Sequence, residues 1–299
     1  MRKIVFLLLP GLHLLNLAGP AQVFSELATL GHPVELHHVA EFPEVPTAQG
    51  VTLRATTDWP EPAPGDLVLV PGWSTAGPTP RVTPAQSEAL VAHHASGGTV
   101  AGVCSGAFVL GLTGLLDGRR CTTHHSLQEK LARRHPRARV VPDVLYVSDD
   151  RVMTSAGIAG GIDLALHVVT RRHGPSVAAS VAREMVVHSR RNGDEPQESV
   201  MLRHRAHSVD AVHRTQEVID ARFHEPLPLA DLAAAAGVGE RTLTRAFVDA
   251  TGLTPLRYQQ RLRVERAEQL IDKGATLEFA ARTVGFRDAR MLRRLRAHP

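Results

Sequence analysis

A cysteine and a histidine in the first half of the chain are of types that can do covalent chemistry. Cys104 lies in AGVCSGAFVLG (residues 101–111), where a buried strand is expected to end and a helix to begin. Gly102 and Gly106 flank it, and small residues permit the sharp, strained turn that presents a side chain at the edge of a sheet. A sulfur at a helix N-terminus is stabilised as a thiolate. His124, in CTTHHS, follows the next expected strand and is the candidate partner of this thiol.

Cys104 also has a simpler interpretation. Free cysteine is among the most buried residue types, so Cys104 can be a small core residue. The glycine-flanked turn favours instead an exposed sulfur that lines a pocket. The first loop, residues 11–22, contains no Asp or Glu that could serve the thiol as an acid.

The surrounding pattern predicts an α/β fold. Short apolar runs of strand length alternate with segments of helical spacing, which is typical of an open, mostly parallel sheet covered on both faces. Thr83 and Pro84 mark a helix start, as N-cap and first helical residue. The expected strands are Lys3–Leu9, Pro33–Ala40, Asp66–Val70 and Thr99–Val103, and the expected helices between them are Gly19–Leu30 and Thr83–Ser96.

A second kind of chemistry, nucleic-acid recognition, is predicted by LADLAAAAGVGERTLTRAF at residues 229–247. Its first half has apolar residues on one face of a helix, and Gly237 breaks that helix at a tight turn. The following helix turns Leu243 and Phe247 to the core. Its other face has Arg and Thr side chains that can contact bases and phosphates in a major groove. Alone, this segment would fit a helical hairpin with a solvated basic face.

The pattern occurs twice in the last part of the chain. Thr254 and Pro255 begin a long expected helix that ends near Gly274, and residues 277–296 have a further helix–turn–helix pattern around Gly285. Two such units joined by one helix would present two recognition helices about one DNA turn apart. Residues 188–199 lack apolar periodicity and are expected to be a linker.

Composition sets limits on the class of protein. The chain has 299 residues, 43% of them hydrophobic, and a net charge of +4, which permits a polyanionic partner without requiring one. With two cysteines, Cys104 and Cys121, a disulfide framework is excluded and a cytoplasmic location is expected. The N-terminus superficially matches a signal peptide, but Pro10, His13 and Asn16 interrupt its apolar run. We therefore expect a strand, loop and helix there, and no membrane span. His pairs at 37–38 and 93–94 lack a third ligand, so no metal is expected.

Residues 1–187 resemble the ThiJ/PfpI group of class I glutamine amidotransferase-like domains, which have a flavodoxin-like parallel-sheet sandwich. The resemblance implies a site made by an elbow cysteine, a histidine after two threonines and an acid in the first loop. These positions are Cys104, His124 and Asn16 here, whereas relatives that hydrate isonitriles have Asp in place of Asn16. Gln22 likewise occupies a place where Glu is common. The matching segments are LNLAGPAQVF at 15–24, DLVLVPG at 66–72, AGVCSGAFVLG at 101–111, TTH at 122–124 and SAGIAGGIDLALHVV at 155–169.

The substitution at Asn16 favours a binding site over an enzyme. An amide cannot exchange a proton as a carboxylic acid does. We therefore interpret the site as an inherited enzyme cleft that retains ligand binding, with no cofactor. Residues 157–160, at the start of a helix, are a further candidate for contact with a carboxylate ligand. The predicted ligand-binding residues are Asn16, Gly72, Trp73, Cys104, Ser105 and His124.

Residues 208–299 resemble the DNA-binding domain of the AraC/XylS family of transcription regulators, after a linker at 188–207. The resemblance rests on LADLAAAAGVGERTLTRAF, Gly252, TPLRY at 254–258 and RVERAEQLI at 263–271. Arg296 stands where relatives have Phe, and we expect the second helix-turn-helix to be shortened at its C-terminus. The predicted DNA-contacting residues are Arg241, Thr242, Thr244 and Arg245 in the first unit and Arg290 and Arg294 in the second.

Together the two resemblances imply a transcription regulator that binds a double-stranded operator. Its first domain would sense a small nitrogen-containing or carboxylated metabolite and form a homodimer. Two alternatives remain at this stage. One is a Cys104-dependent hydrolase or hydratase, and the other is a regulator that senses oxidation through Cys104.

Overall fold

The computed structural model describes residues 2–187, 191–197, 199–272 and 274–297. The chain divides into two compact units, one ending at Gln197 and the other beginning at residue 198. Among the helices that the structure describes, none is long and apolar enough to cross a bilayer.

The first unit is built on a six-stranded sheet, in the order β2-β1-β5-β6-β10-β9. Its strands are β1 (Lys3–Leu7), β2 (Glu35–Val39), β5 (Leu67–Val70), β6 (Thr99–Val103), β9 (Tyr146–Asp149) and β10 (Val152–Ser155). All neighbours pair in parallel except β9, which runs antiparallel to β10 at one edge. The central strands β5, β6 and β10 are buried at every position, which requires layers on both faces. The predicted flavodoxin-like α/β sandwich is confirmed.

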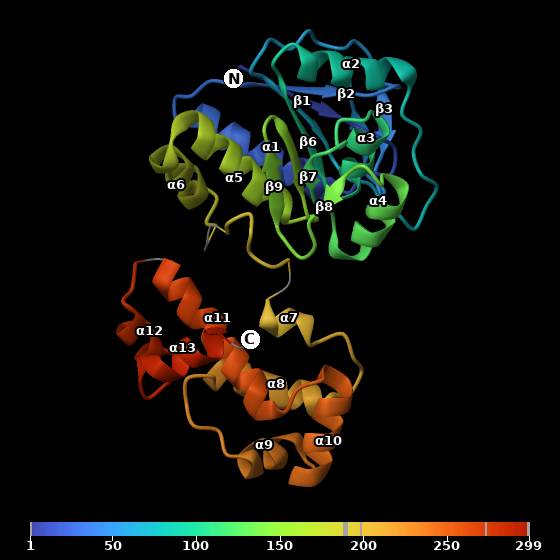
Figure 1. The fold of residues 1–299 in the computed structure, drawn as a ribbon. Helices are drawn as coiled ribbons and strands as arrows, with labels where there is room; N and C mark the ends of the chain where they lie inside the picture. Colours follow the sequence, from blue (N-terminus) through green and yellow to red (C-terminus); the bar gives the residue numbers. More distant parts are fainter. Residues whose placement is uncertain (1, 188–190, 198, 273, 298–299) are drawn as a thin grey trace. The chain divides into compact units, whose positions relative to one another are not determined.

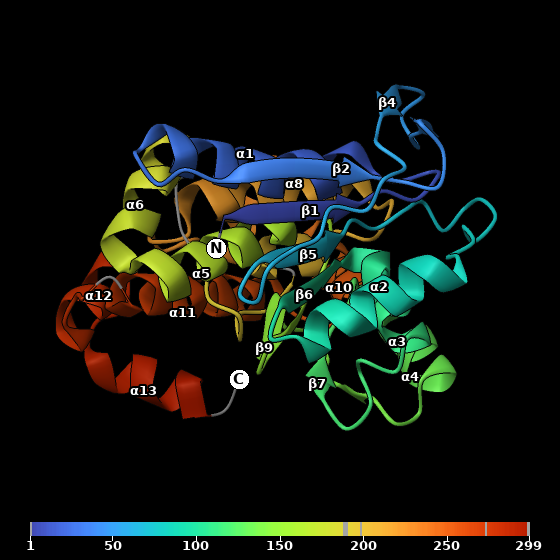
Figure 2. The same cartoon turned by 90° about the horizontal axis from the view of Figure 1, so that it is seen from above.

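Helices cover both faces of this sheet, as Figure 2 shows with α5 and α6 on one side and α2 and α3 on the other. The Thr83 hydroxyl accepts a hydrogen bond from the Gln86 N–H, and the Gln86 side-chain oxygen accepts one from the Thr83 N–H, which confirms the predicted start of α2. Small paired strands and short helical turns complete the unit. The helices are α1 (Leu14–Thr29), α2 (Pro84–Ala95), α3 (Ala107–Leu112), α4 (Gln128–Arg134), α5 (Gly160–His173) and α6 (Pro175–Glu184), with the turns η1 (Cys104–Gly106) and η2 (His125–Leu127). The small strands are β3 (Glu44–Pro46), β4 (Thr52–Arg54), β7 (Arg120–Cys121) and β8 (Arg139–Val140).

The second unit is helical in the part that the structure describes (Figure 1). It contains α7 (Val200–Arg203), α8 (Asp210–Arg222), α9 (Leu229–Ala236), α10 (Glu240–Thr251), α11 (Pro255–Asp272), α12 (Leu277–Thr283) and α13 (Ala289–Ala297). Two apolar cores form within it. One contains Val212, Leu232 and Phe247, and the other contains Ala280 and Leu292. The long helix α11 contributes to both cores, so the two predicted helix–turn–helix units are present and share one helix.

The boundary between the units differs from the expected linker at 188–207. Residues 188–190 lie outside the described residues, but residues 191–197, here called the strap, are held on the first unit. The Leu145 N–H donates to Glu195 O at 3.0 Å, and the Gln197 amide donates to the carbonyls of Thr123 and Val144 at 2.9 and 3.0 Å. Hydrogen bonds from the backbone and from the Gln197 side chain hold a polar segment in place here, and apolar periodicity cannot detect them.

An ion pair anchors the other end of the strap. Arg191 lies 2.5 Å from the carboxylate of Asp163, which is 4% exposed. Burial raises the pKa of Asp163, and the hydrogen bond from Arg191 offsets this only in part. The rest of the predicted linker belongs to the second unit. It forms α7, and Arg205 pairs there with Glu217 and Asp220 at 2.6 Å each.

Candidate ligand site and DNA interface

Cys104 lies at a tight turn that begins where β6 ends. Its φ of +56° is in the left-handed region, which is unusual for a residue with a side chain. A Cβ atom at Gly106 would lie 2.1 Å from the carbonyl oxygen of Val70, and one at Gly72 would lie 2.8 Å from Cβ of Cys104. Glycine is therefore required at positions 72 and 106, because the segments that contain them pass too close to their neighbours to leave room for a side chain. The predicted strained elbow is confirmed.

The surroundings of the Cys104 sulfur are buried and neutral. The side chain is 6% exposed. Hydrogen-bond donors near the sulfur, namely the Asn16 amide, the Ser105 hydroxyl and the N–H groups of Ser105 and Ile158, lower its pKa. Burial has the larger, opposite effect, so the net result is a raised pKa. The expectation of an exposed, thiolate-stabilising position was therefore wrong, because desolvation outweighs the donors at the start of the helical turn.

Asn16 connects α1 to this turn. It is fully buried, and its amide donates to the carbonyl oxygen of Gly72 at 3.0 Å. Its Oδ1 atom is buried and has no hydrogen-bond partner among the described residues. A buried, unsatisfied acceptor costs free energy, which suits a position that a ligand's donor can complete.

Ser105 and Trp73 form a second part of the same cluster. The Trp73 N–H donates to the Ser105 hydroxyl at 2.7 Å, and that hydroxyl donates to the Trp73 carbonyl at 2.9 Å. Trp73 is 5% exposed. The serine side chain thus ties the end of β5 to the elbow.

The predicted partner His124 lies on a segment that contacts the elbow through its neighbour. The Thr123 hydroxyl donates to the Cys104 carbonyl at 2.7 Å. The His124 Nδ1 atom is 2.8 Å from the Ser126 hydroxyl, and its ring lies against His125 with centroids 4.1 Å apart. A Cβ at Gly157 would lie 2.5 Å from the His124 ring, so the loop after β10 passes directly over it.

Sequence reasoning missed two contributors to this site. The Thr123 hydroxyl donates to the Cys104 carbonyl. The Thr123 carbonyl in turn accepts a hydrogen bond from the side chain of the strap residue Gln197. Ile158 supplies an N–H to the sulfur from the loop before α5. Thr123 was part of the TTH segment that carried the resemblance, but no role was predicted for it. The glycines at 157–160 indicated close backbone packing but not which N–H points at Cys104.

In the second unit, α9 and α10 form the predicted helix-turn-helix. Gly237 ends α9 in the left-handed conformation at φ +70°. Leu243 and Phe247 are fully buried, whereas Arg241, Thr242 and Arg245 are exposed. Thr244 is half-buried, and its hydroxyl donates to Glu240 O at 2.9 Å. This hydroxyl is therefore less available for a contact with DNA than expected. Within the part that the structure describes, neither Arg241 nor Arg245 pairs with a carboxylate.

The second helix-turn-helix, α12 and α13, has similar features. Asp288 caps α13 by accepting hydrogen bonds from the backbone N–H groups of Arg290 and Met291. Arg290 and Arg294 are exposed. Arg296 lies 3.3 Å from Glu268 of α11, so a charged pair anchors this helix where relatives were expected to use an aromatic residue.

Arg263 of α11 connects the two helix-turn-helix halves of the second unit. Its guanidinium donates to the carbonyls of Phe223 and Glu225 at 2.6 and 2.8 Å, at the end of α8, and to Gly285 O at 2.9 Å. It also lies 5.7 Å from the ring centroid of Phe286. Burial lowers the pKa of Arg263. A Cβ at Gly285 would lie 2.0 Å from His224 O, so the two turns are in direct contact.

Fold and site together define a chain with an α/β elbow domain followed by a double helix-turn-helix domain. Comparison with known families agrees. Residues 2–171 match the DJ-1/PfpI family and residues 232–297 match a helix-turn-helix domain. This protein belongs to the DJ-1/PfpI family and has an AraC-type helix-turn-helix domain attached to it.

Individual relatives share one or both parts. The HTH-type transcriptional regulator GbdR of Pseudomonas aeruginosa is 27% identical over 278 residues, which is 90% of this chain and 74% of that protein. The isonitrile hydratase of Pseudomonas putida is 32% identical over 189 residues, 61% of this chain and 77% of the enzyme. The crystal structure of an AraC family transcriptional regulator from Pseudomonas putida covers 62% of this chain and all of its own, with a TM-score of 0.55 and 24% identity.

Proposed function

We propose that this protein is a cytoplasmic, sequence-specific DNA-binding transcription regulator. The observation that supports this most directly is the pair of helices α10 and α13, each with exposed arginines, in the segment that matches a helix-turn-helix domain. Guanidinium groups that pair with no carboxylate in the described part of the chain, as at Arg241, Arg245, Arg290 and Arg294, suit contact with phosphates and with guanine edges. Similarity to GbdR along 90% of the chain supports the same assignment for both units together.

We further propose that the first unit binds a small effector near Cys104, and that it forms a homodimer. The unsatisfied Oδ1 of Asn16 and the neutral thiol favour a ligand with a hydrogen-bond donor over a substrate that requires nucleophilic attack. Gly72, Trp73, Ser105 and His124 would line or support the site. These assignments remain predictions.

Footprinting on genomic fragments at two salt concentrations tests the DNA-binding proposal. We expect protection of two successive major grooves and an affinity that falls steeply with salt. Arg245→Ala should weaken operator binding by about 1–3 kcal/mol, or roughly fivefold to 150-fold, without changing the unfolding transition.

Variants in the two helices locate the contacts. Arg290→Ala combined with Arg294→Ala should remove protection from the second groove and leave the first. Arg133→Ala, an exposed arginine paired with Glu129 in the first unit, is the matched control and should bind like the wild type. Equal, weak binding to all fragments by the wild type would contradict sequence-specific recognition.

An enzyme is the second candidate, favoured by the 32% identity to an isonitrile hydratase over the first unit. The raised pKa of Cys104 and the amide at Asn16 provide neither a thiolate nor a proton donor for that reaction. Incubation with simple alkyl isonitriles tests it. Formamide production that is lost in Cys104→Ala would establish the enzyme, and we expect none.

A further inference from the structure

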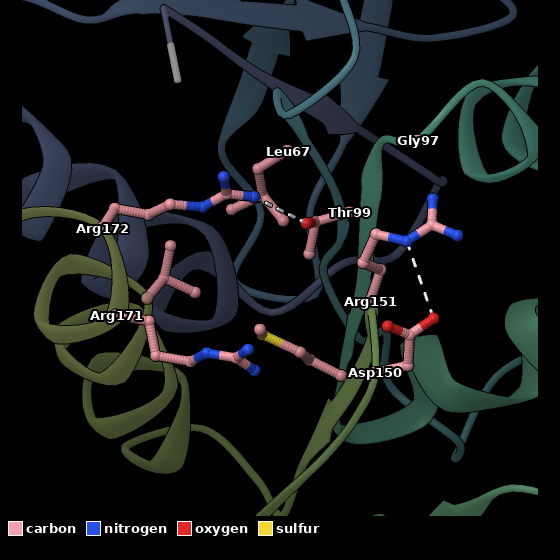
Figure 3. Close-up of a pocket in the computed structure, with 9 residues that line it drawn as sticks. Leu67, Gly97, Thr99, Asp150, Arg151, Arg171 and Arg172 are labelled. Carbon is pink, nitrogen blue, oxygen red and sulfur yellow. Dashed lines mark hydrogen bonds and ion pairs between the residues drawn. The ribbon is translucent and has the colours of Figure 1, made fainter.

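A cavity of about 280 Å³ lies in the first unit (Figure 3). It is at the end of the sheet opposite to Cys104. It opens beside Leu67 and Thr99, the first residues of β5 and β6, whereas Cys104 follows the last residue of β6. The volume is near the lower end of the range for small-molecule sites in proteins. Nothing in the regulator proposal assigns a role to this region.

Two arginines from the last turn of α5 face the cavity. Arg172 donates to the Thr99 hydroxyl at 3.1 Å, and Arg171 donates to the Ser148 hydroxyl at 3.0 Å. Arginines at a helix C-terminus ordinarily stabilise the helix by bonding to its last carbonyls. These two instead extend to strand residues, and Figure 3 shows both guanidinium groups directed toward the middle of the site.

The charge of this arginine pair is not neutralised within the cavity. Asp150 is the one carboxylate among the described residues that line it, and it lies 3.6 Å from Arg151. The guanidinium of Arg151 is also bonded to His94 O at 2.7 Å, and Figure 3 shows it turned away from Arg171 and Arg172. Each guanidinium has five N–H donors, so most donors of Arg171 and Arg172 can serve an anion.

The inner wall of the cavity is apolar. Leu67, Met153 and Val168 line it and are 1%, 5% and 4% exposed. An apolar wall beside two cations suits a molecule with a hydrocarbon part and one anionic end. Carboxylates pair with guanidinium groups in bidentate geometry, which adds strength and orientation.

We propose that this cavity binds a small aliphatic carboxylate, with its anionic end on Arg171 and Arg172 and its chain against Leu67, Met153 and Val168. The site is separate from the elbow and independent of Cys104. It gives the first unit a second ligand site in addition to the one proposed near Asn16.

Calorimetric titration of the full-length protein with pentanoate tests this inference. We expect saturable binding of one pentanoate per chain, and no binding of the neutral analogue pentanamide. The double variant Arg171→Gln, Arg172→Gln should raise the Kd at least tenfold, because it removes both charge-assisted contacts. Arg183→Gln, an exposed arginine of α6 that bonds to Ser180, is the matched control and should leave the Kd unchanged.

Other outcomes would overturn the proposal. Absence of pentanoate binding, or equal binding to the double variant, would exclude the arginine site. Inorganic phosphate that binds more tightly than pentanoate would exclude the role of the apolar wall. Loss of binding in Cys104→Ser would place pentanoate at the elbow instead. If the double variant does not fold, as judged by circular dichroism, the single change Arg171→Glu must still weaken binding.

Discussion

Cys104 and Arg245 are both residues whose type suggested function, yet the structure places them in opposite environments. Cys104 is 6% exposed and has bonded neighbours on three segments, and its pKa is raised by burial. Arg245 is exposed on α10 and has no carboxylate partner in the described part of the chain. The difference separates two kinds of proposed site. At the elbow, the atoms proposed to bind a ligand also hold the fold together, whereas on α10 the groups proposed to contact DNA can change with little effect on the fold.

The difference between the two environments can be tested by substitution, and the largest loss of stability is expected at the elbow. Gly106→Ala would place a Cβ atom 2.1 Å from Val70 O, a backbone atom that cannot move aside. We expect the unfolding free energy to fall by about 3 kcal/mol or more. Urea denaturation measures this. Gly77→Ala is the control, because a Cβ there meets nothing within 4 Å, and should stay within about 0.5 kcal/mol of the wild type. Similar stability of the two variants would mean that the elbow is not tightly packed.

A smaller effect is expected at Arg263, which combines the two environments because it is a partly buried charged group within the DNA-binding unit. Arg263→Gln removes donors from the carbonyls of Phe223, Glu225 and Gly285, and should cost about 1–3 kcal/mol of unfolding free energy. Operator protection should be lost at one groove before the other, since the two halves are no longer held together. Arg261→Gln, an exposed neighbour on α11, should unfold like the wild type. Unchanged stability and an unchanged footprint in Arg263→Gln would show that α11 holds the two helix-turn-helix halves in position without the Arg263 hydrogen bonds.

The smallest effect concerns thiol reactivity. Burial raises the pKa of Cys104 and raises that of Cys121 to about 11. Since the thiolate is the nucleophile, alkylation by iodoacetamide should be slower in the native protein than in urea. Its rate should rise only above the pH range of an ordinary thiol. The folded state retains these protons more strongly than the unfolded state, so stability should decrease as pH rises through the thiol range.

The same measurement bears on the redox alternative. Rapid labelling of Cys104 at neutral pH, identified by mass spectrometry, would contradict the structure and favour oxidation sensing. Cys104→Ser supplies the control for labelling at Cys121.

Much of this architecture follows from local pattern. The apolar runs that became β5 and β6, the cap at Thr83 and the turn at Gly237 are each determined by neighbours in sequence, and all were predicted. The environment of Cys104 was not, because the burial of the thiol, and the donors from Asn16 and Ile158 that partly offset its effect on the pKa, involve segments distant in the chain. The role of Arg263 was also missed, since nothing in the sequence distinguishes an arginine bonded to three carbonyls from one in solvent.

Because the strap is held on the first unit, fewer residues join the two units than the predicted linker contained. The predicted linker of residues 188–207 would have allowed the DNA-binding unit to move widely. With residues 191–197 held on the first unit and α7 starting at Val200, the sequence leaves Glu198 and Ser199 between them. Releasing the strap would add seven extended residues, or about 25 Å of reach. That distance approaches the length of one DNA turn, so release of the strap would widen the range of half-site spacings open to the homodimer proposed above.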